Sequence, residues 1–266
     1  MVLIEDLLEV PRECIVDNVI PKKDIFEAAE SKTKDKKIFT DLIKQIKWCY
    51  NFTEDNIRVD KYIDDERKYE EVELINIDLK YDNVHKIGIG KFKEDEKIDR
   101  IADIVMRFIP YPLILTIQYE NELKFYASHI RESKADYDKI VLDGKTRSTN
   151  WMDIDNLSEI EEDFITKIQF DNLDRTDFYK FYNTYLEAIV QHDAAIIADG
   201  SVNMSIDEIE RLYDEISIFD EKIKEIEKEI SEEDNFNRKM DLNIEAHKFK
   251  VEKERLINEL KSDIYG

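Results

Sequence analysis

Glycine and proline are scarce in this chain, whose 266 residues include 5 glycines and 4 prolines. An all-β sandwich or barrel with many tight turns needs both residues, so their shortage favours helices combined with a compact sheet. Long apolar runs are lacking as well. The longest largely apolar stretch, from Ile109 to Ile117, has about half the length that a membrane span requires, so we expect no transmembrane helix.

Cysteine is also rare. Cys14 and Cys49 lie far apart, and the sequence contains no Cys-x-x-Cys pair. The first six residues are acidic and lack the apolar run of a signal peptide. We therefore predict a cytoplasmic protein with two reduced thiols.

Positive charge is in short supply, because 40 basic residues face 63 acidic ones and give a net charge of −23. A surface this acidic repels the phosphate backbone, which disfavours a free-standing nucleic-acid-binding protein. From net charge alone we expect basic rather than acidic protein partners, no membrane association, and nucleic acid only indirectly, within a complex.

Hydrophobic residues make up 42% of the chain, including 13 Tyr, 13 Phe and 2 Trp, which is enough for a sizeable core. Apolar residues alternate from Val72 to Lys80 and predict a strand with one buried side. Other patterns predict helices at 37–50, 95–108 and 176–197, a short strand at 56–59, a hairpin of 113–117 with 123–130, and a second hairpin within 140–151. The resulting prediction is an α+β domain over residues 1–155, with a mixed sheet of five to six strands and packed helices, followed by a helical bridge at 156–200.

The C-terminal segment carries a strict three-four alternation of apolar residues on an otherwise charged helix. A capping box, Ser205 to Glu208, opens this helix, and residues 231–235 interrupt it before a second helix. Residues 205–234 hold 4 basic and 13 acidic residues (−9), while 235–266 hold 7 and 6 (+1), so folding back lowers repulsion. We predict an antiparallel, coiled-coil helical hairpin over 201–266. The alternating positions are Ile209, Leu212, Ile216, Phe219, Ile223, Ile226 and Ile230.

The seam of the second helix is weaker, because Lys253 stands where an apolar residue is wanted. A helix from a partner protein would complete it, or a second copy of the chain through the coiled coil. The predicted partner-binding residues are therefore the seven alternating positions together with Phe236, Arg238, Lys239, Phe249 and Leu256.

Several short segments occur together in a characteristic order. They are Val19-Ile20-Pro21-Lys22, Lys37-x-Phe39 leading to Trp48, Asp78-Leu79-Lys80, Ile109-Pro110-Tyr111-Pro112, Asn150-Trp151, and 235–243 with Asn-Phe-Asn-Arg-Lys-x-x-Leu-Asn. With this ordered set the chain resembles a bacterial domain-of-unknown-function family, the one numbered 4391, from about residue 17 to 262. The resemblance implies genes placed beside DNA helicases and DNA methyltransferases in restriction-like or phage-defence islands, and it implies no catalytic residues.

One constellation suggests chemistry. Asp60 followed by Asp78-x-Lys80 matches the order of a restriction-type nuclease core, in which two carboxylates hold Mg²⁺ and a lysine steadies the attacking water. The alternative is a strand whose solvent face carries ordinary charges. Gly88-Ile89-Gly90-Lys91 lacks the length and the hydroxyl residue of a phosphate loop and is interpreted as a turn. The histidines show no metal-ligand spacing, so a cofactor is predicted only under the nuclease alternative, as Mg²⁺.

The sequence thus favours a non-catalytic accessory subunit of a bacterial DNA-modification, restriction or phage-defence complex, which docks a helicase or methyltransferase through the hairpin. A Mg²⁺-dependent nuclease and a self-associating structural protein are the two alternatives.

Overall fold

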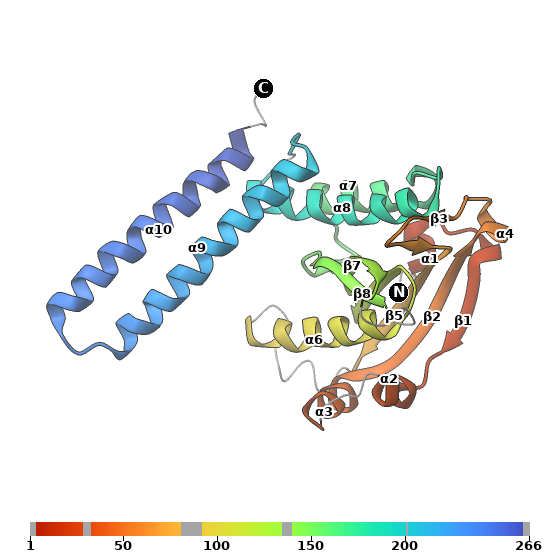
Figure 1. Cartoon of the computed structure of the whole chain (residues 1–266), viewed down its shortest axis with the longest axis horizontal. Coiled ribbons are helices and arrows are strands. Elements are labelled where there is room, and N and C mark those ends of the chain that lie inside the picture. Colours follow the sequence, from red (N-terminus) through yellow and green to blue (C-terminus); the bar gives the residue numbers. More distant parts are fainter. Residues whose placement is uncertain (1–3, 29–32, 81–91, 135–139, 201, 263–266) are drawn as a thin grey trace. The chain divides into compact units, whose positions relative to one another are not determined.

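The computed structural model describes residues 4–28, 33–80, 92–134, 140–200 and 202–262 (Figure 1). The chain forms two compact units, Met1–Ile189 and Val190–Gly266. The boundary between them falls inside helix α8 (Phe178–Ala198).

The first unit is built around a mixed sheet of seven strands in the order β1-β2-β5-β6-β7-β8, with β9 paired to β7. Strands β5 and β6 are parallel and are connected through helix α6 (Phe92–Phe108), whereas the other neighbours are antiparallel. The predicted mixed sheet of an α+β domain is confirmed, and it has seven strands instead of the five to six that were predicted. The strands are β1 (Ile15–Val19), β2 (Ile43–Thr53), β5 (Glu71–Leu79), β6 (Leu113–Tyr119), β7 (Glu122–Glu132), β8 (Ile140–Ser148) and β9 (Met152–Asp153).

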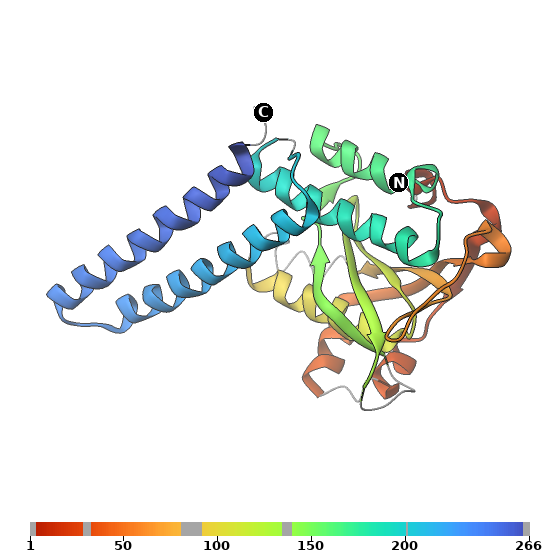
Figure 2. The ribbon, with the colours of Figure 1, turned by 45° about the horizontal axis from the view of Figure 1, so that its top comes forward.

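Helices cover both faces of this sheet, as the two views of the ribbon show (Figure 2). Tyr126 belongs to the core beneath α3 (Thr33–Leu42) and α6, while its neighbour Phe125 packs edge-on against Phe164 of α7 (Glu159–Ile168), with 5.3 Å between ring centroids. The opposite directions of these two side chains follow from the period-two alternation of a strand. Short elements complete the unit: α1 (Ile4–Leu8), α2 (Lys22–Ala28), α4 (Glu54–Ile57), the small sheet β3 (Tyr62–Ile63) with β4 (Lys68–Tyr69), and two 3₁₀ turns at Arg12–Cys14 and Phe170–Asn172.

Most of the expected elements are present, including β5, α6, the β6–β7 hairpin, α7 and α8. Strand β5, however, is buried on both sides over most of its length rather than on one. The helix predicted over 37–50 is wrong in its second half, because α3 ends at Leu42 and β2 begins at Ile43. A register shift between Ile43 and Gln45 breaks the alternation at the start of β2. Ile43 and Ile46, three residues apart, therefore both face the same core, which is also a helical spacing.

Two further local predictions are wrong. Residues 54–57 form helix α4, where Thr53 and Asn56 make a capping box and Arg58 ends the helix with a left-handed backbone (φ 54°), so 56–59 is no strand. Asp143-Gly144 lies inside β8 rather than at a turn. Strands β8 and β9 both pair with β7, so 140–151 forms no hairpin of its own.

The second unit contains the predicted helical hairpin, made of α9 (Ile206–Glu232) and α10 (Phe236–Ser262). Ion pairs fix the antiparallel register: Lys250 to Glu227 at 2.7 Å near the tip, and Arg211 to Glu259 at 3.2 Å near the base. The Ser205 capping box opens α9 as expected, with the side-chain oxygen of Ser205 accepting from the backbone N–H of Glu208. None of the helices in the described segments is both long and apolar enough to cross a membrane.

Candidate functional site

The structure separates Asp60 from Asp78. Asp60 follows α4, and its carbonyl accepts a hydrogen bond of 2.9 Å from the backbone N–H of Phe178. This places it near the N-terminal end of β5, where Thr53 pairs with Glu71. Asp78 lies at the other end of the same strand, and the 9 residues of β5 span roughly 25 Å at about 3.3 Å per residue.

Lys80 does not join Asp78 either. Its ammonium donates to the carbonyl of Thr40 at 2.5 Å, and its backbone N–H donates to the carbonyl of Leu42 at 2.8 Å, so the side chain lies along the end of α3. Lys80 follows the last residue of β5, so the alternation of the strand no longer decides its direction. The predicted site of two carboxylates and a lysine is therefore not assembled. No group of three or more potential metal-binding His, Cys, Asp or Glu residues occurs among the described residues.

Around Asp78 there is instead a polar hollow of about 380 Å³ on the sheet. Side chains from adjacent strands form it in two rows: Gln45, Asp78 and Gln118 share one register level of β2, β5 and β6. Lys47 and Asn76 form the next level, where the buried Thr116 lies beside Asn76 without lining the hollow. We call these six residues together with Asp17 the polar grid. Ile4, Val19, Cys49 and Tyr50 also line the hollow.

Hydrogen bonds fix the positions of Thr116, Asn76 and Asp78 in the polar grid. The buried hydroxyl of Thr116 donates to Oδ1 of Asn76 at 2.9 Å, and Nδ2 of Asn76 donates to Oδ1 of Asp78 at 2.8 Å. At the edge, Lys47 forms a 2.6 Å ion pair with Asp17. Polar residues on a central strand are costly to bury unless they are paired, and here the pairing also orients one carboxylate toward the hollow.

The sequence alone did not identify Gln45, Asn76 and Gln118 as site residues. The available signal was a polar residue inside each of two apolar runs, Asn76 between Ile75 and Ile77, and Thr116 between Leu115 and Ile117. What brings these residues together is the pairing of three strands, which the sequence does not display.

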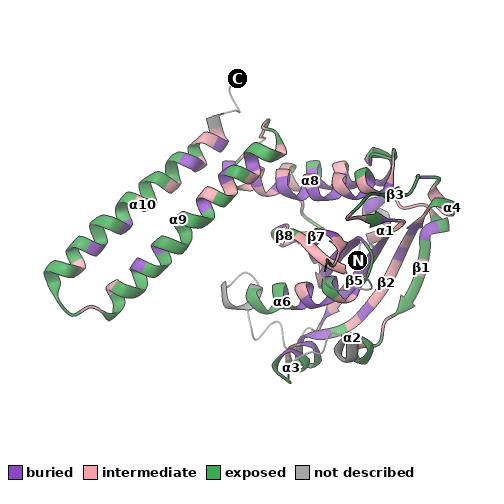
Figure 3. Cartoon of the chain, in the orientation of Figure 1, coloured by how far each residue is buried: buried purple, intermediate pink, exposed green. Residues whose placement is uncertain are grey.

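The seam predicted to bind a partner is mostly used inside the hairpin. Ile209, Leu212, Ile216, Ile223 and Ile226 are buried, as are Leu242, Ala246, Leu256 and Leu260 of α10 (Figure 3). Phe219 and Phe249 are half-buried and pack against each other with 5.9 Å between ring centroids. Lys253, expected to weaken the seam, reaches Asp220 at 2.6 Å. These seam residues are not available as a surface for a partner, because the hairpin already covers them.

A different apolar surface lies on the outer side of α10. Phe236, Met240, Ile244 and Val251 have 76%, 57%, 51% and 48% of their surface exposed. At about 100° per residue they fall within an arc of roughly 80° on the side of the helix away from its buried residues. We call these four residues the α10 stripe. Of the predicted partner-binding set, Phe236 belongs to it.

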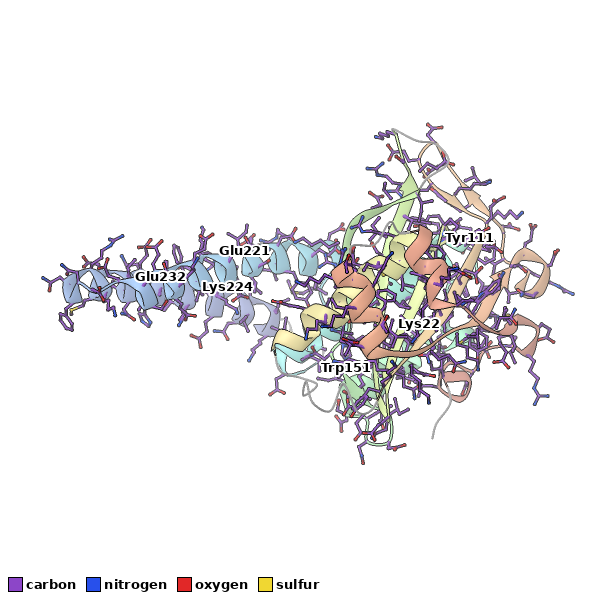
Figure 4. All side chains as sticks on the ribbon, turned by 90° about the horizontal axis from the view of Figure 1, so that it is seen from below. Lys22, Tyr111, Trp151, Glu221, Lys224 and Glu232 are labelled. Carbon is purple, nitrogen blue, oxygen red and sulfur yellow. The ribbon has the colours of Figure 1, made fainter. Side chains whose placement is uncertain are left out.

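Basic residues accompany the α10 stripe. Arg238, Lys239 and Lys248 form no ion pair within the described part of the chain. The neighbouring helix α9 is strongly acidic, and Figure 4 draws its side chains with Glu221, Lys224 and Glu232 labelled. The hairpin thus presents the apolar α10 stripe with Lys239 and Lys248 at its borders, and with Asp241 and Glu245 beside Ile244 and Lys248.

Comparison with known proteins gives one match. The model of the family described as "Domain of unknown function (DUF4391)" matches residues 8–252, which is most of the chain. The protein belongs to the DUF4391 family. This match extends through the sheet, α7, α8, α9 and most of α10, so the α10 stripe lies within the family region of this DUF4391 protein. Neither the curated proteins nor the solved structures contain a match.

Proposed function

We propose that this DUF4391 protein is a non-catalytic accessory subunit that docks a partner protein through the α10 stripe. The observation that supports this function is that the apolar seam between α9 and α10 is buried, whereas the α10 stripe on the same hairpin is exposed. The buried seam already accounts for the stability of the helix pair, so the four exposed apolar residues are not needed for it. Contiguous exposed apolar residues mark interaction sites more often than solvated surface.

The partner surface that fits best is a helix with an apolar side bordered by acidic residues. Helices bind to an exposed helical face through anchors at i, i+4 and i+8, which is the spacing of Phe236, Met240 and Ile244. Lys239 and Lys248 border these anchors and supply the complementary charge. For this face we therefore propose a partner with acidic borders, in place of the basic partner expected from the net charge.

The stripe reaches over 15 residue steps, from Phe236 to Val251, or roughly 22 Å at about 1.5 Å per residue. A third helix of about four turns would cover it and complete a three-helix bundle. A DNA helicase or DNA methyltransferase of a bacterial modification, restriction or defence system is the partner class, on the basis of the gene neighbourhood that the resemblance implies. The protein would act in that system without contacting DNA by itself.

The docking role predicts a large effect of charge on the stripe. In the double variant Met240→Asp, Ile244→Asp we expect the affinity for the helicase or methyltransferase encoded by the neighbouring gene to fall at least 100-fold in calorimetric titrations. Burying two large apolar side chains is worth about 3 kcal/mol or more, which corresponds to about two orders of magnitude in Kd. Helical content measured by circular dichroism should not change, because both residues are exposed.

Ile218→Asp is the matched control, because Ile218 is 51% exposed and lies on α9 rather than on the α10 stripe. This variant should bind like the wild type. Equal binding by the double variant would contradict the proposal. Light scattering adds a second test: a wild-type dimer that the double variant converts to a monomer would assign the stripe to a second copy of the chain.

A further inference from the structure

We propose that the polar grid binds a small planar group that carries two adjacent N–H donors, as found in a guanidinium or in the base edge of guanine. The site lies wholly in the first unit and is separate from the α10 stripe. The hollow of about 380 Å³ is large enough for such a group together with part of the molecule that carries it.

The groups of the polar grid that face the hollow are mainly acceptors. Asp78 uses Oδ1 for Asn76, and its Oδ2 has no hydrogen bond to any described residue. Gln118 donates through Nε2 to the carbonyl of Glu120 at 3.1 Å, which leaves its Oε1 as an acceptor. Because Asp78 and Gln118 are direct partners across β5 and β6, the two acceptors lie about 5 Å apart at their backbones.

This arrangement is fixed before a ligand arrives. Asn76 is 5% exposed and Thr116 is fully buried, and their hydrogen bonds hold the carboxylate of Asp78 in one orientation. A preorganised carboxylate binds paired N–H donors with two parallel, charge-assisted hydrogen bonds.

The charge of the hollow also favours a ligand that carries N–H donors. Asp17 and Asp78 oppose the single cation Lys47, which is already paired with Asp17. A phosphate or carboxylate ligand would face net negative charge and a lysine already engaged, whereas a cationic or donor-rich group is attracted. Val19 and Tyr50 supply apolar wall area for the flat faces of such a group.

Backbone strain occurs at the same place. Asp17 has a left-handed backbone (φ 57°) in edge strand β1, where the register to β2 shifts between Ile15 and Asn18. A non-glycine residue in this conformation costs about 1 kcal/mol or more. The bulge turns the Asp17 carboxylate toward Lys47 and so shapes the rim of the hollow.

Calorimetric titration of the full-length protein with agmatine and, separately, with guanosine tests this inference. The wild type should bind at least one probe, and Asp78→Asn should weaken that binding about 10- to 100-fold, because the isosteric amide loses the charge-assisted pair. Asp171→Asn, an exposed position elsewhere in the same unit, should bind like the wild type. Binding of guanosine alone would assign a nucleobase, and binding of agmatine alone would assign an arginine side chain.

A second variant keeps the test valid if Asp78→Asn folds poorly. Gln118→Leu preserves the size of the side chain but removes the second acceptor, and we expect it to weaken binding as well. Failure of the wild type to bind either probe would overturn the inference, as would unchanged binding by both folded variants.

Discussion

Replacing Tyr182 by phenylalanine should lower the free energy of unfolding by about 3 kcal/mol, although the change removes one oxygen atom. The hydroxyl of Tyr182 is fully buried and lies where β6 and β7 stop pairing. It accepts a hydrogen bond of 2.9 Å from the backbone N–H of Ser128 and lies 2.9 Å from the carbonyl oxygens of both Ser128 and Leu113.

These backbone groups need Tyr182 because the pairing of β6 with β7 ends at Leu115 and Tyr126, short of Leu113 and Ser128. The register between β7 and β8 shifts between Ala127 and His129, so Ser128 has no regular partner in β8. In the phenylalanine variant the buried N–H of Ser128 and at least one carbonyl lose their partner. Each unsatisfied group costs about 1–3 kcal/mol.

Denaturant unfolding of the full chain measures this difference. Tyr179→Phe is the control, since Tyr179 lies one turn earlier in α8 and its half-buried hydroxyl makes no hydrogen bond among the described residues. We expect Tyr179→Phe to change stability by less than about 0.5 kcal/mol. Amide hydrogen exchange at Ser128 should accelerate in Tyr182→Phe, and an unchanged exchange rate together with unchanged stability would show that the hydroxyl has no such role.

The elements predicted correctly from the sequence are those whose signal is local. The Ser205 capping box marks the start of α9 and is present with the expected hydrogen bonds. Strand β5 follows from alternation, and the β6–β7 hairpin follows from two apolar runs, 113–117 and 123–130, that a short segment separates. In each case a few residues adjacent in the sequence determine the element.

The incorrect predictions concern elements whose conformation is decided by distant partners. Strand β2 pairs with both β1 and β5, and two register shifts, between Ile43 and Gln45 and between Trp48 and Tyr50, hide its alternation. Residues 140–148 pair with β7 rather than forming a hairpin within 140–151. The sequence of these segments is compatible with either outcome, and the sheet selects one of them.

In the candidate sites, too, local features were predicted correctly and features that depend on distant partners were not. The heptad pattern of α9 correctly predicts an apolar seam packed in a hairpin. It does not indicate that α10 covers this seam without the help of a partner, or that α10 presents a second stripe on its other side. Likewise, the spacing of Asp78 and Lys80 is visible in the sequence. That Lys80 turns to Thr40 while Asp78 faces Gln118 depends on where β5 ends and which strand lies beside it.

Glu73 makes the stability of this protein dependent on pH. Its side chain is 4% exposed and lies on β5, where it accepts a hydrogen bond from the indole N–H of Trp48. Burial raises the pKa of Glu73 from 4.5 to about 8; the nearby charge of Glu71 adds to the rise, and the Trp48 hydrogen bond opposes it. The folded state therefore holds a proton that the unfolded chain releases between these two pH values.

The direction of the effect follows from this difference. A carboxyl group whose pKa is higher in the folded state contributes its full stability below about pH 4.5, and it loses this contribution as the pH rises toward 8. The slope for one such group is about 1.4 kcal/mol per pH unit within this window. Glu73→Gln keeps an oxygen that accepts from Trp48 but has no proton to lose.

We therefore expect Glu73→Gln to unfold at nearly the same denaturant concentration as the wild type near the acidic end of this window, and to be more stable by roughly 3 kcal/mol near pH 7. Urea titrations of both proteins at several pH values measure the difference. Glu71→Gln changes a nearby half-buried carboxylate. This variant should still lose most of the stability that the wild type loses as the pH rises. If the Glu73→Gln and wild-type curves stay parallel across the window, the carboxyl of Glu73 is ionised within the fold, and Trp48 with its surroundings must then stabilise a buried negative charge.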